Sequence, residues 1–205
     1  MTFAVRADAY DRYMGRYSVP LAPVFAGFAA VAAGQLVLDV GCGPGALTGE
    51  LIRRAGPSTV SAVDPSESFV SAARERHPTV DVRQASAEHL PFEDEAFDAV
   101  LAQLVVHFMA DPVAGLREMA RVARKQGVVG ACVWDHAGGG GPLSLFWEAA
   151  RALVPDVEDE SRWTGAREGD LAHLLQRVGV RDIEESMLSV SVEHPSFEEW
   201  WEPFT

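Results

Sequence analysis

The feature that most constrains the fold is a glycine-rich stretch at residues 36–48, LVLDVGCGPGALT. An apolar run leads to Asp39, three glycines follow at alternate positions (41, 43 and 45), and a helical pattern then begins. In such a turn the backbone approaches a ligand closely, and the N–H groups of the following helix point at it. The stretch therefore predicts a nucleotide-binding turn between a first strand and a first helix.

From residue 34 onward, short β-branched runs alternate with helical patterns. Ser66 and Asp111 are the expected N-caps of the second and third helices. Because the strands are apolar on both faces, the fold class is α/β, with a mostly parallel sheet covered by helices. Strands are predicted at residues 35–40, 58–64, 79–84, 96–103 and 127–134, and helices at 46–56, 66–77 and 111–124.

After residue 134 this alternation stops. A glycine-rich loop with a hinge-like run of four glycines leads to two predicted helices, a sixth strand and a short helix that begins at Ser196. A chain of 205 residues suits one domain. We divide it into N-terminal helices that form a lid (1–33), a cofactor-binding core (34–134), a second lid or insertion (135–167) and the C-terminal part of the sheet (168–205). The two helices are predicted at 143–154 and 168–179, and the sixth strand at 183–192.

Composition narrows the range of partners and locations. The chain has 30 acidic and 17 basic residues, and no Lys/Arg cluster could neutralise phosphates, which argues against a nucleic-acid partner. The sequence has neither the basic-then-apolar pattern of a signal peptide nor a stretch apolar enough to span a membrane. Cys42 and Cys132 suggest neither a disulfide framework nor a metal site, so we expect a cytoplasmic protein without a metal ion.

Two nucleotide patterns compete for the glycine turn. Gly41, Gly43 and Ala46 satisfy the dinucleotide fingerprint G-x-G-x-x-G/A, and Asp64 lies about 20 residues on, where its ribose-binding acid belongs. Gly41, Gly43 and Gly45 equally satisfy the D/E-x-G-x-G-x-G pattern of enzymes that use S-adenosylmethionine (SAM). The glycines alone do not separate the two ligands.

Asp39 separates them in part, through its charge. A dinucleotide presses a pyrophosphate against this turn, and a carboxylate at the end of the strand would repel that anion. SAM instead presents a sulfonium and an ammonium group, which a carboxylate favours. Asp39 also has a purely structural interpretation, in which it accepts hydrogen bonds from backbone amides of the turn. The charge argument nevertheless favours SAM.

Four ordered motifs, VLDVGCGPG, AVDPSESFVSAARER, ASAEHLPFEDEAFDAVLAQ and LREMARVARKQGVV, resemble those of class I SAM-dependent methyltransferases. The resemblance is closest to the methyltransferase type 11 group, which includes ubiquinone/menaquinone-type enzymes, and it covers residues 10–134 well. It implies a Rossmann-like, doubly wound sheet, SAM as the cofactor and a small-molecule methyl acceptor. It also implies a strand after the sixth one, antiparallel and inserted between the fifth and the sixth.

The resemblance assigns roles to individual positions. Asp64 would accept hydrogen bonds from both ribose hydroxyls, and Ala87 would offer its backbone N–H to adenine. Gln103 would lie near the methionyl group. Where the family often has an aspartate for the adenine amino group, this chain has Ser86, whose hydroxyl accepts without charge. The full set implied to bind the cofactor is Asp39, Gly41, Cys42, Gly43, Gly45, Asp64, Pro65, Ser86, Ala87, Glu88 and Gln103.

Methyl transfer needs alignment of nucleophile and methyl group, and it needs a base only when the nucleophile arrives protonated. Three side chains near the carboxyl ends of the fourth and fifth strands are candidate bases, with His107 ahead of Asp135 and His136. The N-terminal stretch YDRYMGRYS is expected to form a helix over the cofactor. Candidate acceptor-site residues are Tyr13, Arg16, Trp134 and Asp135.

Two alternatives remain open at this point: a SAM-binding module without transferase activity and an NAD-dependent oxidoreductase. A structural expectation concerns the C-terminal part of the sheet, because the sequence offers no strand after residues 183–192. The fifth strand would then border a gap. We expect that the natural chain continues, that a partner chain completes the sheet, for example in a homodimer, or that a strand within residues 142–168 fills the gap.

Overall fold

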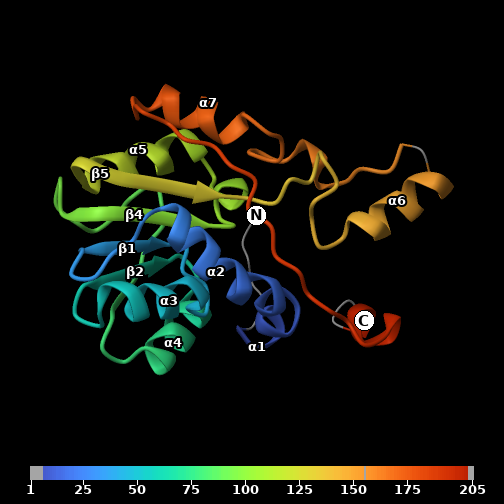
Figure 1. Cartoon of the computed structure of the whole chain (residues 1–205), viewed down its shortest axis with the longest axis horizontal. Coiled ribbons are helices and arrows are strands. Elements are labelled where there is room, and N and C mark those ends of the chain that lie inside the picture. Colours follow the sequence, from blue (N-terminus) through green and yellow to red (C-terminus); the bar gives the residue numbers. More distant parts are fainter. Residues whose placement is uncertain (1–6, 155, 203–205) are drawn as a thin grey trace.

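A five-stranded parallel sheet forms the centre of the computed structural model, which describes residues 7–154 and 156–202 (Figure 1). The strand order is β3-β2-β1-β4-β5, and each neighbouring pair is parallel. This confirms the α/β class and all five of the core strands predicted. Their bounds are β1 Val37–Val40, β2 Val60–Asp64, β3 Asp81–Gln84, β4 Phe97–Gln103 and β5 Ala123–Cys132.

Helices cover both faces of the sheet, as the doubly wound topology requires. One core lies between the sheet and α2, α3 and α4, and the other between the sheet and α5 and α7. Along β1, successive residues alternate between the two cores: Val37 belongs to the first and Leu38 to the second. The helices are α2 Arg16–Phe28, α3 Ala46–Ala55, α4 Glu67–Arg76, α5 Pro112–Val122 and α7 Asp170–Arg177.

The remaining helical elements lie around the carboxyl ends of the strands or away from the sheet. α6 extends from the body of the molecule (Figure 1) and buries none of its own residues fully. The N-terminal lid helix is confirmed as helical, although it contains a π-helical turn. These elements are α1 Ala7–Tyr10, η1 Asp11–Gly15, η2 Val106–Phe108, α6 Ser144–Leu153, η3 Glu160–Arg162 and α8 Phe197–Trp201.

Of the two predicted N-caps, Asp111 is confirmed. Ser66 has the predicted position, but its side chain does not make the capping hydrogen bond. Asp111 accepts hydrogen bonds from the backbone of Val113 and Ala114, both at 3.0 Å. Ser66 stands at the N-cap position of α4, but its side chain makes no capping bond and pairs with the Ser68 hydroxyl instead. The Ser66 N–H donates to Asp64, so the carboxylate of the preceding strand organises this helix start.

The predicted sixth strand is wrong. Among the described residues, 183–192 run extended but pair with no strand, and β5 has a neighbouring strand only on its β4 side. Ile183 packs against the second core and Leu188 against the first. Apolar burial therefore holds this segment beside the sheet without a hydrogen-bonded ladder.

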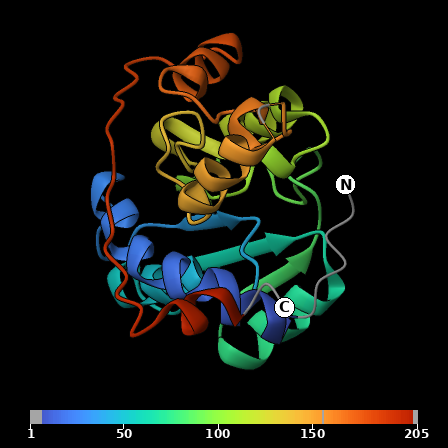
Figure 2. The same cartoon turned by 90° about the vertical axis from the view of Figure 1, so that its right-hand side faces the viewer.

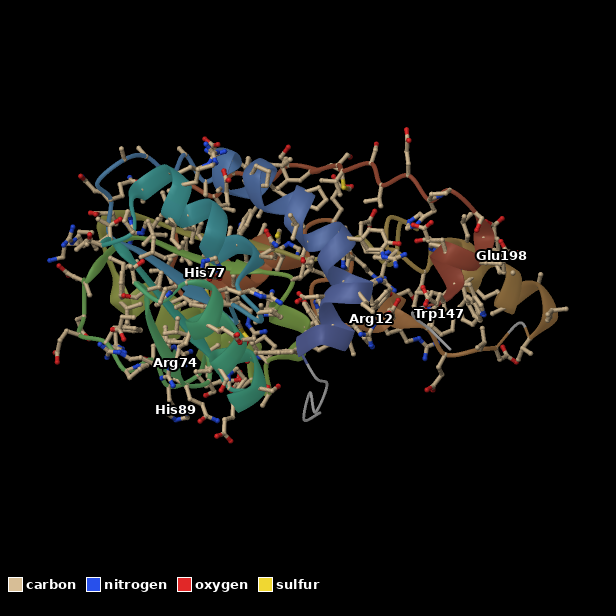
Figure 3. All side chains as sticks on the ribbon, turned by 90° about the horizontal axis from the view of Figure 1, so that it is seen from below. Arg12, Arg74, His77, His89, Trp147 and Glu198 are labelled. Atoms are coloured by element: carbon tan, nitrogen blue, oxygen red, sulfur yellow. The ribbon has the colours of Figure 1, made fainter. Side chains whose placement is uncertain are left out.

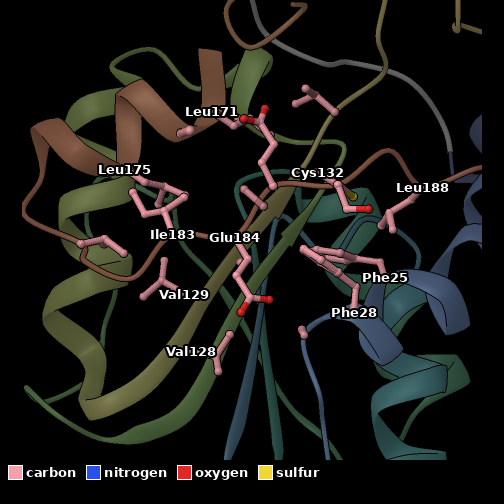
Figure 4. Close-up of a pocket in the computed structure, with 18 of the residues that line it drawn as sticks. Phe25, Phe28, Val128, Val129, Cys132, Leu171, Leu175, Ile183, Glu184 and Leu188 are labelled. Carbon is pink, nitrogen blue, oxygen red and sulfur yellow. The ribbon is translucent and has the colours of Figure 1, made fainter. Parts of the chain in front are cut away.

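A groove separates β5 from the 183–192 segment, with a volume of about 1470 Å³. Its lining includes Val128 and Val129 of β5 together with Ile183 and Leu188 of that segment; Figure 4 shows Ile183 near Val129 and Leu188 near Phe25 of α2. The gap expected beside the fifth strand is thus present in the described part of the chain. Residues 142–154 and 156–168 contain no strand that could fill it, so the third of our three expectations is wrong.

The predicted C-terminal helix is confirmed as α8, and its N-cap is Ser196. Figure 2 shows it lying against the N-terminal helices. Arg16 donates to the Glu199 carbonyl at 3.0 Å, and the Tyr17 hydroxyl lies 3.2 Å from Nε2 of His194. These contacts bring two segments distant in sequence together beside the carboxyl ends of the strands.

Within residues 7–154 and 156–202, no helix has both the length and the apolar character that a bilayer span requires.

The groove should bind an apolar dye, because Val128 is 37% exposed on the free side of β5. We expect Val128→Lys to lower the fluorescence of a bound naphthalene sulfonate dye and to leave thermal stability nearly unchanged, as exposed substitutions usually do. Val24→Lys is the matched control, since Val24 is 38% exposed on α2 outside the groove. Equal dye binding by both variants and the unmodified protein would show that the groove is not the dye site.

Candidate functional site

The glycine turn lies where the carboxyl ends of β1, β2 and β4 meet, which is where open α/β sheets bind ligands. Gly41 has φ +70°, and a Cβ there would lie 2.5 Å from Val105 Cγ2. Gly45 has φ +99°, and its Cβ would lie 2.7 Å from the ring of His77. Both positions therefore exclude a side chain, for steric as well as conformational reasons.

Every backbone N–H group of the turn from residue 41 to residue 45 is used inside the protein. Gly41 and Cys42 both donate to the Val63 carbonyl, at 2.8 and 3.0 Å, and Gly45 donates to the Cys42 carbonyl at 3.0 Å. Gly43 donates to the Asp64 carboxylate at 2.9 Å. Residue 44 is a proline and has no N–H. The turn consequently offers no free donor at these positions for an anionic ligand.

Asp64 closes the site on the β2 side. Its Oδ2 accepts from Gly43 and its Oδ1 from the N–H of Ser66 at 2.8 Å. The side chain is buried, and burial raises its pKa above the ordinary aspartate value. Each carboxylate oxygen has two lone pairs, so one per oxygen remains for a ligand.

Asp39, at the end of β1, is buried more completely. The Thr48 hydroxyl donates to its Oδ2 at 2.6 Å. Burial raises its pKa to about 7 against the opposing effect of that hydrogen bond, and the nearby charge of Asp64 raises it further. The purely structural interpretation of Asp39 therefore applies in part: its partner is Thr48, at the start of α3.

The N-terminal lid lies over this turn. The Tyr10 ring is the nearest group to the missing Cβ of Gly43, at 3.9 Å, and it packs against Phe69 with ring centroids 5.2 Å apart. Arg76 at the end of α4 forms an ion pair with Asp11 and thereby ties the lid to the core. Burial and the nearby Asp64 raise the pKa of Tyr10 to about 12, so its hydroxyl stays protonated.

The residues expected around adenine lie together between β3 and α5. Ala87 is buried and Ser86 half-buried. Glu88 accepts from the N–H groups of Ala110 and Asp111, at 2.8 and 3.2 Å, and so braces the start of α5. Pro65, at the exposed end of β2, accepts from the Gln84 side chain through its carbonyl, at 3.0 Å.

Gln103, at the end of β4, faces the N-terminal helices. Its Nε2 donates to the Ser18 carbonyl at 3.0 Å. Its Oε1 is buried and has no hydrogen-bond partner among the described residues. The amide thus ties β4 to α2 and keeps one acceptor available.

The candidate acceptor-site residues separate into two groups. Tyr13 is close enough to Glu160 for that carboxylate to raise its pKa, although burial is the larger cause. Trp134 packs edge-on against Tyr17, at 6.3 Å, and its buried Nε1 lacks a partner in the described chain. Arg16 is instead committed to α8, and Asp135 accepts from Gly138 at 2.8 Å, so it shapes its own loop.

His107, the first candidate base, lies in η2 after β4. It stacks on Trp163 with ring centroids 5.3 Å apart, and its buried Nδ1 has no partner in the described chain. Burial lowers its pKa to about 4, and His136 lowers it further, so the ring is neutral at physiological pH but a weak base.

His136, which sequence reasoning ranked below His107, contacts a carboxylate. Its Nδ1 lies 3.3 Å from Glu160 Oε2, which also accepts from Trp147 Nε1 at 3.0 Å. Glu160 and Trp163 were missed as site residues, because they belong to a segment with no recognisable motif. Their only signal was position, in the predicted insertion that returns toward the strand ends.

A metal centre was also sought in the part of the chain that the structure describes. Within it, no group of three or more His, Cys, Asp and Glu side chains could hold a metal ion.

Comparisons with known proteins agree with this geometry. Residues 38–131 match the model of the family described as a methyltransferase domain. An uncharacterized methyltransferase of Mycobacterium tuberculosis is 36% identical over 135 residues, which cover 66% of this chain and 52% of that protein. The chloroplastic 2-methyl-6-phytyl-1,4-hydroquinone methyltransferase 2 of Oryza sativa is 32% identical over 129 residues, 62% of this chain and 36% of its own length.

The fold is also shared with solved structures. The crystal structure of a SAM-dependent methyltransferase from Aquifex aeolicus matches with a TM-score of 0.61 at 20% identity, and the match covers 82% of this chain and 83% of that one. The sheet and the glycine turn define a Rossmann-like nucleotide-binding domain of the class I SAM-dependent methyltransferase type. Residues 38–131 of the chain resemble the Methyltransf_11 family. It spans about half the length, or less, of the two curated relatives compared.

The raised pKa of Asp39 makes stability depend on pH in a direction unusual for a carboxylate. At pH values between the ordinary aspartate pKa of 3.8 and the folded-state pKa of about 7, the native state holds a proton that the unfolded state has lost. The unfolding free energy should therefore fall as pH rises through this window, by something on the order of 4 kcal/mol.

Asp39→Asn keeps the shape and removes the charge, so it isolates this effect. We expect the variant to melt at a higher temperature than the unmodified protein at pH 8 and at a similar temperature at pH 5, by calorimetry without cofactor. Asp81→Asn is the control, because Asp81 is half exposed and paired with Arg83. Parallel melting profiles across this pH range would contradict the buried, protonated Asp39.

Proposed function

We propose that this protein is a SAM-dependent methyltransferase that transfers a methyl group to a small-molecule acceptor. The observation that carries the proposal is that the turn's N–H groups are all used inside the protein, three by β2 and that of Gly45 by the turn itself. A pyrophosphate needs free donors at such a turn, whereas the cationic methionine end of SAM needs acceptors and negative charge. Asp64 and the free acceptor of Gln103 provide acceptors, and the Asp64 carboxylate provides the negative charge.

The residues around the turn fit SAM on the grounds of shape and chemistry. Gly43 leaves backbone bare for close approach, and Asp64 retains lone pairs for ribose hydroxyls. Tyr10 above Gly43 would exclude water from the bound cofactor. When bound, SAM supplies an electrophilic methyl group, and the protein's task is to orient the acceptor toward it.

A small-molecule acceptor is supported by the wall of aromatic rings beside the turn. His107, His136 and Trp163 lie within ring-contact distance of each other. The formal charge of −13 disfavours polyanionic acceptors such as nucleic acid. The Oryza sativa relative, by its name, acts on a hydroquinone. A cytoplasmic location and a homodimer joined beside β5 are part of the same proposal.

The two alternatives make different use of the same site. A SAM-binding module without transferase activity would have no need of the histidine cluster beside the turn. An NAD-dependent oxidoreductase would place a pyrophosphate against a turn with saturated donors and two carboxylates. Titration with SAM, S-adenosylhomocysteine and NADH distinguishes them, because an oxidoreductase would bind only the last.

Asp64→Ala should weaken SAM binding at least tenfold, because a hydrogen bond to a charged acceptor contributes about 1.5–3 kcal/mol. Isothermal calorimetry measures the affinity, and the melting temperature of each variant shows whether the fold is retained. Asp94→Ala is the matched control, since Asp94 is exposed and pairs with Arg121. Unchanged affinity for SAM in a folded Asp64→Ala variant would remove Asp64 from the cofactor site.

A further inference from the structure

The insertion after β5 holds His136 in one orientation. Its Nδ1 lies 3.3 Å from Glu160 Oε2, and the same oxygen accepts from Trp147 Nε1. Glu160 comes from η3 and Trp147 from α6, so two separate elements fix the carboxylate. Figure 3 places Trp147 at the end of the molecule where Arg12 of the N-terminal lid lies.

Two further contacts confine the His136 ring. A Cβ on Gly141 would lie 2.8 Å from its Nδ1, so the chain approaches the ring closely at this glycine. The Trp163 ring meets it edge-on at 5.6 Å. The His136 side chain is only 7% exposed.

The confined ring lies beside the glycine turn. On one side, the ring centroids of His136 and His107 are 6.1 Å apart. His107 follows Val105 by two residues, and the Val105 side chain packs against Gly41. On the other, Glu160 and Tyr10 both act electrostatically on Tyr13. These neighbours link the His136 ring to the turn on one side and, through Glu160, to the N-terminal helices on the other.

We propose that Glu160, held by Trp147, positions His136 as the proton acceptor for a hydroxyl-bearing methyl acceptor, an alcohol or a phenol. A carboxylate at Nδ1 keeps the proton on that nitrogen and leaves the Nε2 lone pair basic. The acceptor oxygen bonds to the methyl carbon while its proton passes to Nε2. The carbon–sulfur bond breaks with its electrons left on sulfur, and His136 later releases the proton to solvent.

The inference rests on the proposed function and adds the acceptor class and the base. It also replaces His107, whose Nδ1 has no hydrogen-bond partner among the described residues. Burial lowers the pKa of His136, while Glu160, Asp135 and Asp159 oppose that shift, so the ring is unprotonated at neutral pH. His107 faces it as a neutral ring. Activity should fall only in acid, below the ordinary histidine pKa of 6.5.

The first test measures the His136 ring without turnover. Nitrogen-15 NMR of the full chain with S-adenosylhomocysteine should show the Nδ1–H tautomer, with the signal identified by its loss in His136→Asn. Gly141→Ala should displace the ring and change the signal. Gly140→Ala is the matched control, because its Cβ would meet Asp135 Cβ at an ordinary 3.4 Å. An Nε2–H tautomer in the unmodified protein would overturn the proposal.

The second test measures transfer from labelled SAM to catechol, hydroquinone, 4-nitrophenol, benzylamine and a thiol. We expect methylation of at least one hydroxyl compound, and His136→Asn should lower its kcat by about 100-fold or more, as loss of a general base does. KM should change little. Glu160→Gln and Trp147→Phe should cause smaller losses, and His173→Asn, on an exposed face of α7, should cause none.

A phenol acidic enough to ionise in the assay buffer provides the rescue. Because 4-nitrophenolate arrives without its proton, His136→Asn should lose far less activity with it at alkaline pH than with catechol. Transfer only to the amine or thiol, transfer to a hydroxyl insensitive to His136, or SAM binding without transfer to any compound would each overturn the inference. Failure to bind SAM at all would instead overturn the proposed function.

Discussion

The carboxylate of Asp64 and the carbonyl of Val63 are the groups on which the site depends. Together these neighbours at the end of β2 accept the N–H groups of Gly41, Cys42 and Gly43. The turn that follows β1 is therefore shaped by the adjacent strand. Left-handed φ values at its glycines let the chain curve tightly enough for this pairing. As a result, the binding surface is formed by the sheet itself before any ligand contributes.

The same pairing explains the electrostatic character of the site. A turn whose donors are saturated presents carbonyl oxygens and carboxylates to an incoming ligand. Asp39 and Asp64 are both buried beneath it, and the charge of Asp64 raises the pKa of Asp39. Such a site favours a cation and disfavours a phosphate, which the glycine spacing alone could not establish.

The sequence was most informative where structure is local. The five core strands, the cap at Asp111 and the start of α8 at Ser196 follow from periodicity and capping chemistry, and the structure confirms each. The sequence was misleading where a structure depends on a segment distant in sequence or on a competing side chain. Residues 183–192 alternate like a strand, but a strand exists only where a ladder partner lies alongside, and the described chain supplies none. Ser66 is a favourable cap by type, yet its hydroxyl pairs with Ser68 and its own N–H donates to Asp64.

In the candidate site, too, local features could be predicted from the sequence and contacts between distant segments could not. The turn, Asp39 and Asp64 could be identified from a pattern in one short stretch. Glu160 could not be identified in this way, because its relation to His136 depends on how the insertion folds back over 24 residues of chain. No periodicity or spacing predicts that contact. Only the folded chain reveals which of two histidines, His107 or His136, has a carboxylate beside it.

The contacts between α8 and the N-terminal helices have a consequence for the order of folding. Tyr17 and His194 are 177 residues apart in sequence, and Arg16 and Glu199 are 183 apart. Contacts this distant incur the largest loop-closure entropy, so they form after local and sheet contacts have already restricted the chain. The glycine turn, built from residues 41–64, is complete well before these two segments meet. Formation of the turn therefore does not depend on the contacts that join the two ends of the described chain.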